Sequence, residues 1–290
     1  QGGNNMKKML LVLLACAMLF AGCTRQESKD DEAESSAAQT SESEATAADY
    51  TTSPPADAMQ ADFGDYSRDK VIWGPGNTVD HQRPADPVSL QKQFGDLGAT
   101  FIGPDTKTIC LTFDEGYENG YTPQILDTLK EKGVKAVFFV TYDFAKANPK
   151  LVQRMIDEGH IVGNHTYRHY TMDEVDLSVA EEEIRVLHDY VADTFDYEMK
   201  YFRFPKGEFS EQTLYLAQMM GYESVFWSFA YADWDTEDPP DEQEALRLLT
   251  ESTHGGAIYL LHAVSATNAN ILGAAIDNIR AQGYTFTTDI

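Results

Sequence analysis

Short apolar runs of β-forming residues alternate with helical patterns from Asp105 to the end of the chain, and this alternation is the strongest constraint on the fold. Apolar runs bounded by glycine, proline or polar residues are typical of strands, and apolar stripes of helical period are typical of helices. The pattern predicts strands over residues 109–113, 134–140, 160–163, 201–204, 224–227, 257–261 and 284–287. It predicts helices between them over residues 123–132, 149–158, 178–194, 211–220, 241–252 and 269–282.

Strict alternation of strands and helices favours an α/β fold with parallel strands and helical crossovers. The seven predicted strands fit a closed or nearly closed barrel better than two separate sheets. A doubly wound open sheet is the alternative. In a barrel, the carboxyl ends of the strands converge on one face, where active sites are built.

The charge of the chain bears on its partners. The 290 residues carry 22 basic and 47 acidic side chains, a net charge of −25. Such a surface repels phosphate backbones, so nucleic acid is not an expected partner. A role of this charge in solubility alone is also possible. We expect a monomer.

Beyond residue 23 the chain has a single cysteine, Cys110, which we expect to be a small buried core residue rather than part of a disulfide.

Residues 1–23 have the pattern of a secretory leader. Lys7 and Lys8 precede an apolar run over residues 9–21 that is too short to span a bilayer comfortably. The run ends in L-F-A-G-C, which resembles the lipobox of bacterial lipoproteins and implies lipidation of Cys23. We therefore expect the protein to be anchored to the outer face of the cytoplasmic membrane through Cys23. The alternative is secretion after ordinary cleavage.

Residues 24–62 are rich in Ser, Thr, Ala and acidic residues, with ten acids against Arg25 and Lys29. A segment with so little apolar surface cannot offset its ordering entropy, so we expect a disordered, extended tether. Residues 63–104 contain Trp73, Gly74-Pro75-Gly76, Pro84 and Pro87. We interpret them as an irregular N-terminal arm packed on the main domain, which we place at residues 105–290.

Candidate site residues lie at the carboxyl ends of five of the predicted strands. They are Asp114 and Glu115, then His165 and His169, then Arg203, Pro205 and Gly207, then Asp233 and Trp234, and finally His262. Because the carboxyl ends of the strands meet on one face of a barrel, we expect these side chains to surround one site. Gly116 follows the acid pair directly, and we expect it to turn the chain so that both acids lie in the mouth of the barrel.

His165 and His169 are spaced by four residues, so that in a helical turn both would face one way and could share a metal. Surface histidines at this spacing are common, so the pair alone is a weak signal. Together with a carboxylate on the same face, the pair indicates a two-histidine, one-carboxylate hydrolytic centre with open positions for water.

Five ordered motifs then resemble a known family. T-F-D-E-G, N-H-T-Y-R-H, R-F-P-K-G, A-D-W and L-L-H are similar to the motifs of the NodB-homology polysaccharide deacetylases, carbohydrate esterase family 4. The resemblance covers roughly residues 106–290, and it is greatest to the peptidoglycan branch that includes delta-lactam-biosynthetic de-N-acetylases. It implies a distorted (β/α)7 barrel, in agreement with the strand count.

The resemblance also implies roles for the motif residues. Asp114 would be the general base, and Arg203 would orient it. Glu115, His165 and His169 would hold a divalent metal, zinc for preference.

On the leaving-group side, His262 would protonate the departing amine, held by Asp233. The backbone N–H of Lys206, in the turn from Pro205 to Gly207, would stabilise the oxyanion. Trp234, and with it Tyr259, would line the acetyl pocket, with ordinary core packing as the alternative for both.

Two departures from the family pattern bear on function. Glu115 stands where a second aspartate is usual, and Ala230 replaces the first acid of the fourth motif. A catalytically weakened, glycan-binding lipoprotein is therefore one rival reading. A retaining glycosidase using Asp114 and another acid is a second.

The resemblance implies that the substrate is the glycan strand of peptidoglycan. N-acetylmuramic acid stripped of its stem peptide is the expected target, with muramic delta-lactam as the eventual product. N-acetylglucosamine is the alternative target. Arg203, Lys206 and Arg168 are the candidates to receive the muramic carboxylate.

Overall fold

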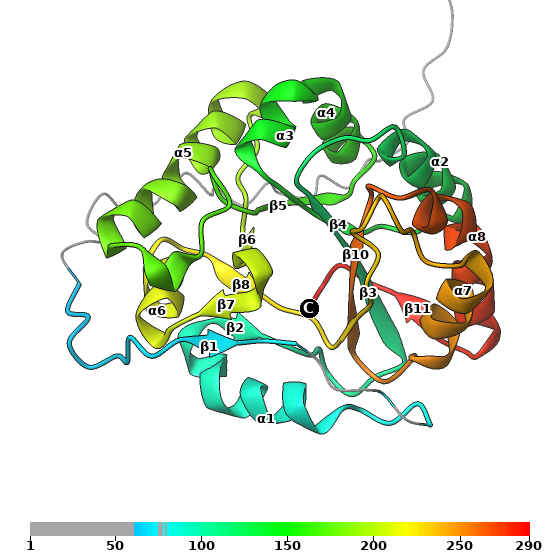
Figure 1. The fold of residues 1–290 in the computed structure, drawn as a ribbon, viewed down its shortest axis with the longest axis horizontal. Coiled ribbons are helices and arrows are strands. Elements are labelled where there is room, and N and C mark those ends of the chain that lie inside the picture. The colour runs from blue at the N-terminus through cyan, green and yellow to red at the C-terminus, as the bar shows by residue number, and fades with distance from the viewer. Residues whose placement is uncertain (1–60, 75–77, 79) are drawn as a thin grey trace, which may run out of the picture. The chain divides into compact units, whose positions relative to one another are not determined.

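Strand β3 (Thr108–Glu115) runs through the middle of a curled parallel sheet. It pairs with β4 (Val137–Val140) on one side and with β10 (Ala257–His262) on the other. Among the residues that the structure describes, the sheet has nine strands: eight in the order β2-β8-β6-β5-β4-β3-β10-β9, and β11, which also pairs with β3. Helices cover the outside of this curled sheet (Figure 1). The predicted α/β fold, a distorted barrel of parallel strands, is confirmed.

The structure is a computed structural model and describes residues 61–74, 78 and 80–290. The remaining strands are β1 (Val71–Ile72), β2 (Ala99–Thr100), β5 (Ile161–Asn164), β6 (Tyr201–Phe202), β7 (Glu208–Phe209), β8 (Glu223–Val225), β9 (Phe229–Ala230) and β11 (Thr285–Phe286). The α-helices are α1 (Ala85–Phe94), α2 (Thr122–Lys132), α3 (Tyr142–Ala147), α4 (Pro149–Asp157), α5 (Leu177–Phe195), α6 (Glu211–Met219), α7 (Glu242–Glu251) and α8 (Ala266–Ala281). Short 3-10 turns are η2 (Gly95–Leu97), η3 (Met172–Glu174) and η4 (Pro205–Gly207).

The N-terminal arm is more regular than expected. It contributes helix α1, and its strand β2 pairs in parallel with β8 as the edge strand of the main sheet. Strand β1 pairs antiparallel with β7 in a separate two-stranded sheet. Apolar residues of the arm, among them Trp73, Phe94 and Phe101, are buried in the common core, and this burial is the physical reason for its order. The predicted leader with Cys23, and nearly all of the predicted tether, lie outside the described residues.

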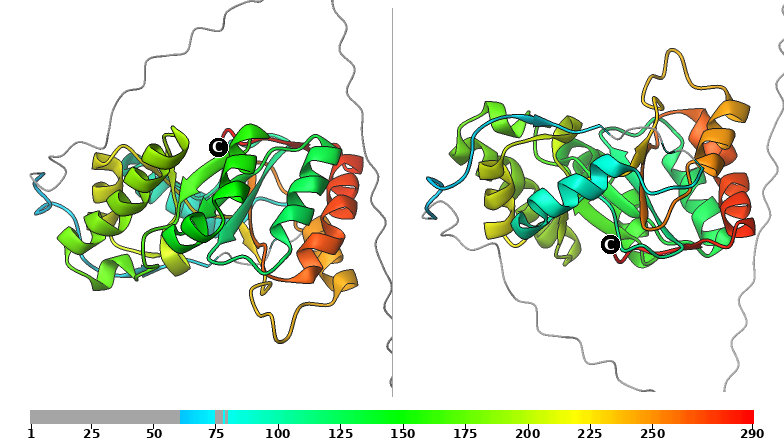
Figure 2. Two further views of the ribbon diagram at one scale, coloured as in Figure 1. Left: turned by 90° about the horizontal axis from the view of Figure 1, so that it is seen from above. Right: turned by 90° about the horizontal axis from the view of Figure 1, so that it is seen from below.

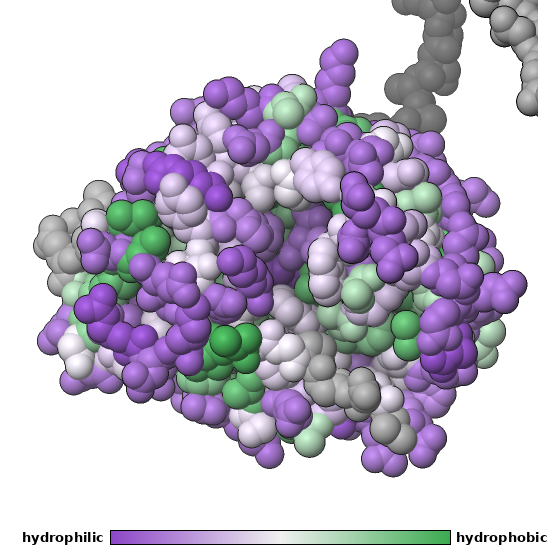
Figure 3. Space-filling model, viewed as in Figure 1, coloured by the Kyte–Doolittle hydropathy of each residue, from purple (hydrophilic) through white to green (hydrophobic). Residues whose placement is uncertain are grey.

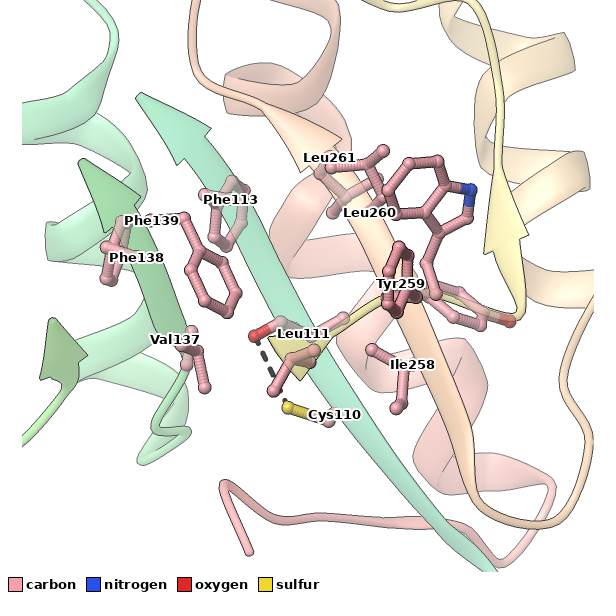
Figure 4. Packing of buried hydrophobic residues seen from close by; sticks show 14 of the residues in the cluster. Cys110, Leu111, Phe113, Val137, Phe138, Phe139, Ile258, Tyr259, Leu260 and Leu261 are labelled. Carbon is pink, nitrogen blue, oxygen red and sulfur yellow. Dashed lines mark hydrogen bonds between the residues drawn. The ribbon is translucent and has the colours of Figure 1, made fainter. Parts of the chain in front are cut away.

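The apolar strand residues form a dense aromatic core (Figure 4). The rings of Phe113 on β3 and Phe138 on β4 are stacked with centroids 5.2 Å apart. Cys110 is a buried free thiol in the same strand, so the expectation of a core cysteine is confirmed. Close packing on both sides of β3 holds its carboxyl end rigidly, which matters because this end carries the chemistry.

The face seen in Figure 3 is largely hydrophilic and is hollowed near its middle. The segment between β9 and α7 projects beyond the neighbouring helices (Figure 2). Among the residues that the structure describes, no helix has both the length and the apolar character needed to cross a bilayer.

Candidate active site

Asp114 lies near the carboxyl end of β3, and its side chain lines a cavity of about 620 Å³. Nη1 of Arg203 donates a hydrogen bond of 2.8 Å to Oδ1 of Asp114. Burial by itself would raise the pKa of Asp114, but the charge of Arg203 and the nearby imidazoles of His165 and His262 bring it below the ordinary aspartate value. Asp114 is thereby kept as a carboxylate, the form that accepts a proton.

Arg203 is itself held in one position. Its Nη1 also donates to Oγ1 of Thr112 over 2.7 Å, and its Nε and Nη2 donate to the carbonyl oxygens of Val225 and Phe226 over 2.9 and 3.1 Å. The side chain is fully buried. Thr112, the first residue of the T-F-D-E-G motif, was given no role in the sequence prediction, although it lies two residues before Asp114 and therefore on the same face of β3.

The two motif histidines lie side by side, but not on a helix. His165 and His169 lie in a loop after β5, and both Thr166 and His169 have positive φ angles, 74° and 60°. The Nε2 atoms of the two imidazoles are 3.2 Å apart. Nδ1–H of His165 donates to the carbonyl oxygen of Arg203 over 2.8 Å, which leaves the lone pair on its Nε2. The loop, rather than the predicted helical turn, brings the two rings together.

Both imidazoles are neutral near pH 7. Burial lowers the pKa of His165, against the opposing charge of Asp114, whose Oδ2 lies 3.5 Å from His165 Nε2. Burial, followed by the proximity of His165, lowers the pKa of His169 to about 4. Neutral imidazole is the form that binds metal ions.

Glu115 is placed differently from the prediction. Strand β3 continues through Glu115, which pairs with Val140 of β4, so the side chains of Asp114 and Glu115 point to opposite faces of the sheet. Glu115 is fully buried, and it accepts hydrogen bonds of 3.4 and 3.3 Å from Oγ1 of Thr122, the first residue of α2. It does not line the cavity. The expectation that Gly116 turns both acids into the mouth of the barrel is therefore wrong.

The chemical state of Glu115 agrees with this position. Burial, reinforced by the nearby carboxylate of Glu118, raises its pKa well above the ordinary glutamate value. The assignment of Glu115 to the metal is corrected by its position, because its side chain lies on the face of the sheet away from the cavity.

The donor set for a metal is consequently smaller than predicted. Within the described part of the chain, no three His, Cys, Asp or Glu side chains form a group that could hold a metal ion. What fits is the imidazole pair of His165 and His169. Zinc binds imidazole nitrogen at about 2.0–2.1 Å, so two such ligands of one tetrahedral ion lie roughly 3.3 Å apart. The observed separation of 3.2 Å agrees with this value.

His262 ends strand β10, in register with Asp114 on β3. Its Nδ1–H donates to Oδ1 of Asp233 over 2.7 Å, and its backbone N–H donates to the other oxygen over 2.8 Å. Burial opposes protonation of the ring, but the hydrogen bond and charge of Asp233, with a further contribution from Asp114, raise the pKa of His262 above its ordinary value. His262 is therefore suited to carry a proton, whereas Asp114 is suited to accept one.

Asn268 completes the surroundings of Asp233. Its Nδ2 donates to Oδ2 of Asp233 over 2.5 Å and to the carbonyl oxygen of His262 over 2.9 Å. Its own Oδ1 accepts a hydrogen bond from the hydroxyl of Tyr231. The sequence prediction missed Asn268, and no spacing rule points to it, because the contact depends on how α8 packs. Asp233 thus has partners although Ala230 replaces the usual acid.

The turn from Pro205 to Gly207 borders the same cavity. Lys206 has a φ of 59° and Gly207 a φ of 70°, so two successive residues are left-handed. A Cβ on Gly207 would lie 2.7 Å from the ring of Trp227, so only glycine fits there. Lys206 lines the cavity.

Apolar side chains also line the cavity. Trp234 lines the cavity with 57% of its surface exposed, and its ring centroid is 6.1 Å from that of His262. Tyr259 does not take part: it is fully buried, and its hydroxyl donates to the carbonyl oxygen of Leu249 over 2.9 Å. The alternative of ordinary core packing holds for Tyr259. Leu260, the next residue on β10 and therefore on the other face, lines the cavity instead.

The other residues around the cavity were not assigned to the site from the sequence, although Gly116 and Ala230 belong to the motifs. They are Gly74 from the N-terminal arm, Gly116 and Tyr117 after β3, Trp227, Ala230 and Val264. The four histidines outside the motifs, His81, His160, His188 and His254, do not line it.

Comparison with known proteins identifies the family. Residues 102–225 match the polysaccharide deacetylase family. The chain is 41% identical over 218 residues to the peptidoglycan-N-acetylmuramic acid deacetylase PdaA of Bacillus subtilis, an alignment that covers 74% of this chain and 83% of PdaA. The chain belongs to the polysaccharide deacetylase family. The family resemblance stated from the motifs is thereby confirmed.

Solved structures agree with this assignment. The polysaccharide deacetylase fold of this chain superimposes on the structure of B. subtilis PdaA, described as a family 4 carbohydrate esterase, with a TM-score of 0.73 at 39% identity, covering 76% of this chain and 95% of that one. A more distant relative is the peptidoglycan-N-acetylglucosamine deacetylase PgdA of Listeria monocytogenes, 34% identical over 182 residues, or 63% of this chain and 38% of PgdA. Members of the family are generally metal-dependent.

Proposed function

We propose that this protein hydrolyses the N-acetyl groups of peptidoglycan amino sugars and that its preferred target is N-acetylmuramic acid from which the stem peptide has been removed. The observation that carries the proposal is the pairing of Asp114 and His262. They lie in register on adjacent strands at the rim of one cavity, one as a carboxylate and the other with a raised pKa. Amide hydrolysis needs such a base and such an acid in succession.

The chain's own residues support the following sequence. Asp114, oriented by Arg203, accepts a proton from the attacking water. The backbone N–H of Lys206 is the proposed donor to the oxygen that gains negative charge on the acetamide carbonyl. His262 then gives its proton to the departing nitrogen, so that the C–N bond breaks to leave acetate and the free amine. Asp233 and Asn268 hold the imidazole of His262 in position.

His165 and His169 are the residues that would hold a divalent cation, with zinc as the proposed metal. Such a cation lowers the pKa of water and polarises the acetamide carbonyl. Because the loop presents two neutral imidazoles without the carboxylate of Glu115, we expect the ion to be bound less tightly than in a three-ligand site.

The muramic target is supported by the similarity to PdaA and by the positive charge of one lysine at the cavity. Muramic acid without its peptide carries a free carboxylate. Of the three candidates, Arg203 is buried and saturated by Asp114, Thr112 and two carbonyl groups. Arg168 pairs with Glu182 at 2.9 Å and with Glu183 at 3.6 Å. Lys206 lines the cavity, and it is the residue that we assign to the carboxylate.

Lactam formation follows from the chemistry of this target. Deacetylation places a free amine near the lactyl carboxylate of the same sugar. Ring closure between two groups held on one sugar has the entropic advantage of an intramolecular reaction. Deacetylation of N-acetylglucosamine, the activity named for PgdA, is the second candidate.

Two rivals are less well supported. A retaining glycosidase needs two carboxyl groups about 5–5.5 Å apart across the scissile bond. Asp114 is the single carboxylate among the described residues that line the cavity, and Glu115 lies on the opposite face of the sheet. A protein that only binds glycan would have no need for the opposed protonation states of Asp114 and His262.

The site of action is proposed from the leader alone. We place the enzyme outside the cytoplasmic membrane, tethered through a lipidated Cys23 and the acidic segment over residues 24–62. There the catalytic domain would meet the glycan strands of the wall.

The decisive experiment offers the purified protein peptidoglycan with and without stem peptides. Acetate release is measured with and without a chelator, and the modified sugar is identified by mass spectrometry after digestion. We expect acetate release from stripped glycan and de-N-acetylated muramic acid or its lactam as product. Glucosamine without any muramic product would restrict the enzyme to the second candidate. New reducing ends without acetate would overturn the deacetylase assignment.

A further inference from the structure

The N-terminal arm reaches the candidate active site through strand β1. In the antiparallel pair with β7, Val71 lies opposite Phe209 and Ile72 opposite Glu208. The next residue continues this register, because the backbone N–H of Trp73 donates to the carbonyl oxygen of Gly207 over 3.0 Å. Gly74 follows Trp73 directly, and both Gly74 and Lys206, the residue before Gly207, line the cavity.

The arm is held in this position by contacts on both sides. Nε1–H of Trp73 donates to the carbonyl oxygen of Trp227 over 3.0 Å, and the indole is buried. Three residues earlier, Nζ of Lys70 lies 2.5 Å from Glu174 and 2.9 Å from Glu208. These contacts fix Trp73 against the turn that carries Lys206, so the position of Gly74 is determined by packing and not by the arm alone.

Gly74 itself leaves space beside Lys206. Both residues line the cavity, and a Cβ built on Gly74 would meet no atom within 4 Å. Gly74 therefore accepts a side chain without strain in the fold, yet that side chain would enter the space next to the Lys206 turn. The family model itself begins at residue 102, whereas the superposition on PdaA covers 76% of this chain and therefore extends into the arm.

We propose that Gly74 is a specificity-determining residue that keeps open, beside Lys206, the subsite for the carboxylate-bearing ether substituent of N-acetylmuramic acid. This inference rests on the proposed function. An N-acetylglucosamine unit has only a hydroxyl at that position and does not need the space. A side chain at position 74 should therefore exclude the muramic sugar selectively.

The test measures binding separately from turnover. Full-length protein carrying Asp114→Asn, which lacks the base, is titrated with the stem-peptide-free disaccharide of N-acetylglucosamine and N-acetylmuramic acid, and with the N-acetylglucosamine dimer. Gly74→Ala, Gly74→Val and Gly74→Leu are added to this background. Ile72→Thr is the matched control, because Ile72 lies on the same strand with its side chain 69% exposed and away from the cavity.

We expect the Kd for the muramic disaccharide to rise with the size of the side chain, by about tenfold or more for Gly74→Leu. The Kd for the glucosamine dimer should change by less than about twofold, and Ile72→Thr should leave both ligands unaffected. Because Gly74 and Lys206 frame one subsite, Lys206→Gln should add little to the effect of Gly74→Leu, whereas independent sites would give additive effects. Thermal unfolding should be unchanged in the Gly74 variants.

Three results would overturn the inference: equal weakening of both ligands, no weakening of either, or full additivity with Lys206→Gln. Failure of the proposed function is a separate outcome, because it would show as absence of acetate release by the parent enzyme on stripped glycan. Suppose that the unmodified enzyme releases acetate, but that adding Gly74→Leu to the Asp114→Asn protein leaves its Kd for the muramic disaccharide unchanged. Only the proposed role of Gly74 is then refuted.

Discussion

His262 lies directly opposite Asp114 in the register of β10 and β3, so the last residue of one strand and the penultimate residue of its neighbour face the same cavity. The pKa of one is raised and that of the other is lowered. Two adjacent parallel strands thereby position a general acid and a general base at one cavity, and neither residue lies on a loop.

Replacement of either Asp114 or His262 should abolish most of the activity. We expect Asp114→Asn and His262→Ala each to lower kcat by on the order of a hundredfold or more, with smaller effects on KM. Asp114→Asn also removes the counter-charge of the buried Arg203 guanidinium, so we expect its unfolding temperature to fall below that of the parent. Steady-state kinetics on stripped peptidoglycan gives the comparison. Activity within a few-fold of the parent in either variant would contradict the assigned roles.

Asp233→Asn should move the alkaline limb of the pH–rate profile to lower pH. The hydrogen bond and charge of Asp233 raise the pKa of His262, so their loss lowers that pKa and deprotonates the acid earlier. The ion pair of His262 and Asp233 stabilises the fold fully at pH values below the ordinary histidine pKa. This stabilisation is lost as the pH rises through the raised pKa of His262. Profiles of kcat against pH for the two proteins provide the measurement, and superimposable alkaline limbs would separate Asp233 from the protonation of His262.

Glu115→Gln should preserve metal content and raise the unfolding temperature near neutral pH. Glu115 is buried with a raised pKa, so the folded protein binds its proton more tightly and its contribution to stability falls as the pH rises. Glutamine keeps the shape and removes this penalty, and a gain of about 1 kcal/mol would correspond to roughly 2–4 °C. The difference between variant and parent should shrink below the ordinary glutamate pKa. Loss of bound metal in Glu115→Gln would return this residue to the metal site.

His165→Ala and His169→Ala should each lose most of the bound divalent ion. With only two imidazoles in the donor set, removal of one leaves a single protein ligand. Metal content is measured after purification, and activity is measured across a zinc titration. His160→Ala is a matched control, since His160 is buried but does not line the cavity. Parent-like metal content in either motif variant would exclude that imidazole as a ligand.

Cys23→Ala should release the protein from the membrane fraction or leave its leader uncleaved. The prediction rests on the lipobox-like run that ends at Cys23, outside the described residues. Fractionation and electrophoretic mobility of variant and parent decide it. Equal membrane attachment with equal mobility would exclude lipidation at this residue.

The sequence by itself determined the parallel α/β barrel and the face on which the chemistry lies. Alternation of strands and helices requires parallel strands with crossovers, and parallel strands put their carboxyl ends on one face. Asp114, His165, His169, Arg203, Asp233 and His262 all follow strands, so their convergence could be predicted from order and spacing alone.

Only the tertiary structure decided which way the neighbouring side chains point. Glu115 faces α2 because its pairing with Val140 extends β3 by two residues beyond the apolar run, and alternation then separates it from Asp114. Gly74, which follows β1, reaches the cavity from the N-terminal arm. Asn268, on α8, reaches Asp233. Neither residue is near its partners in the sequence. Local patterns carry no information on such contacts, because they depend on strand register and helix packing across the whole fold.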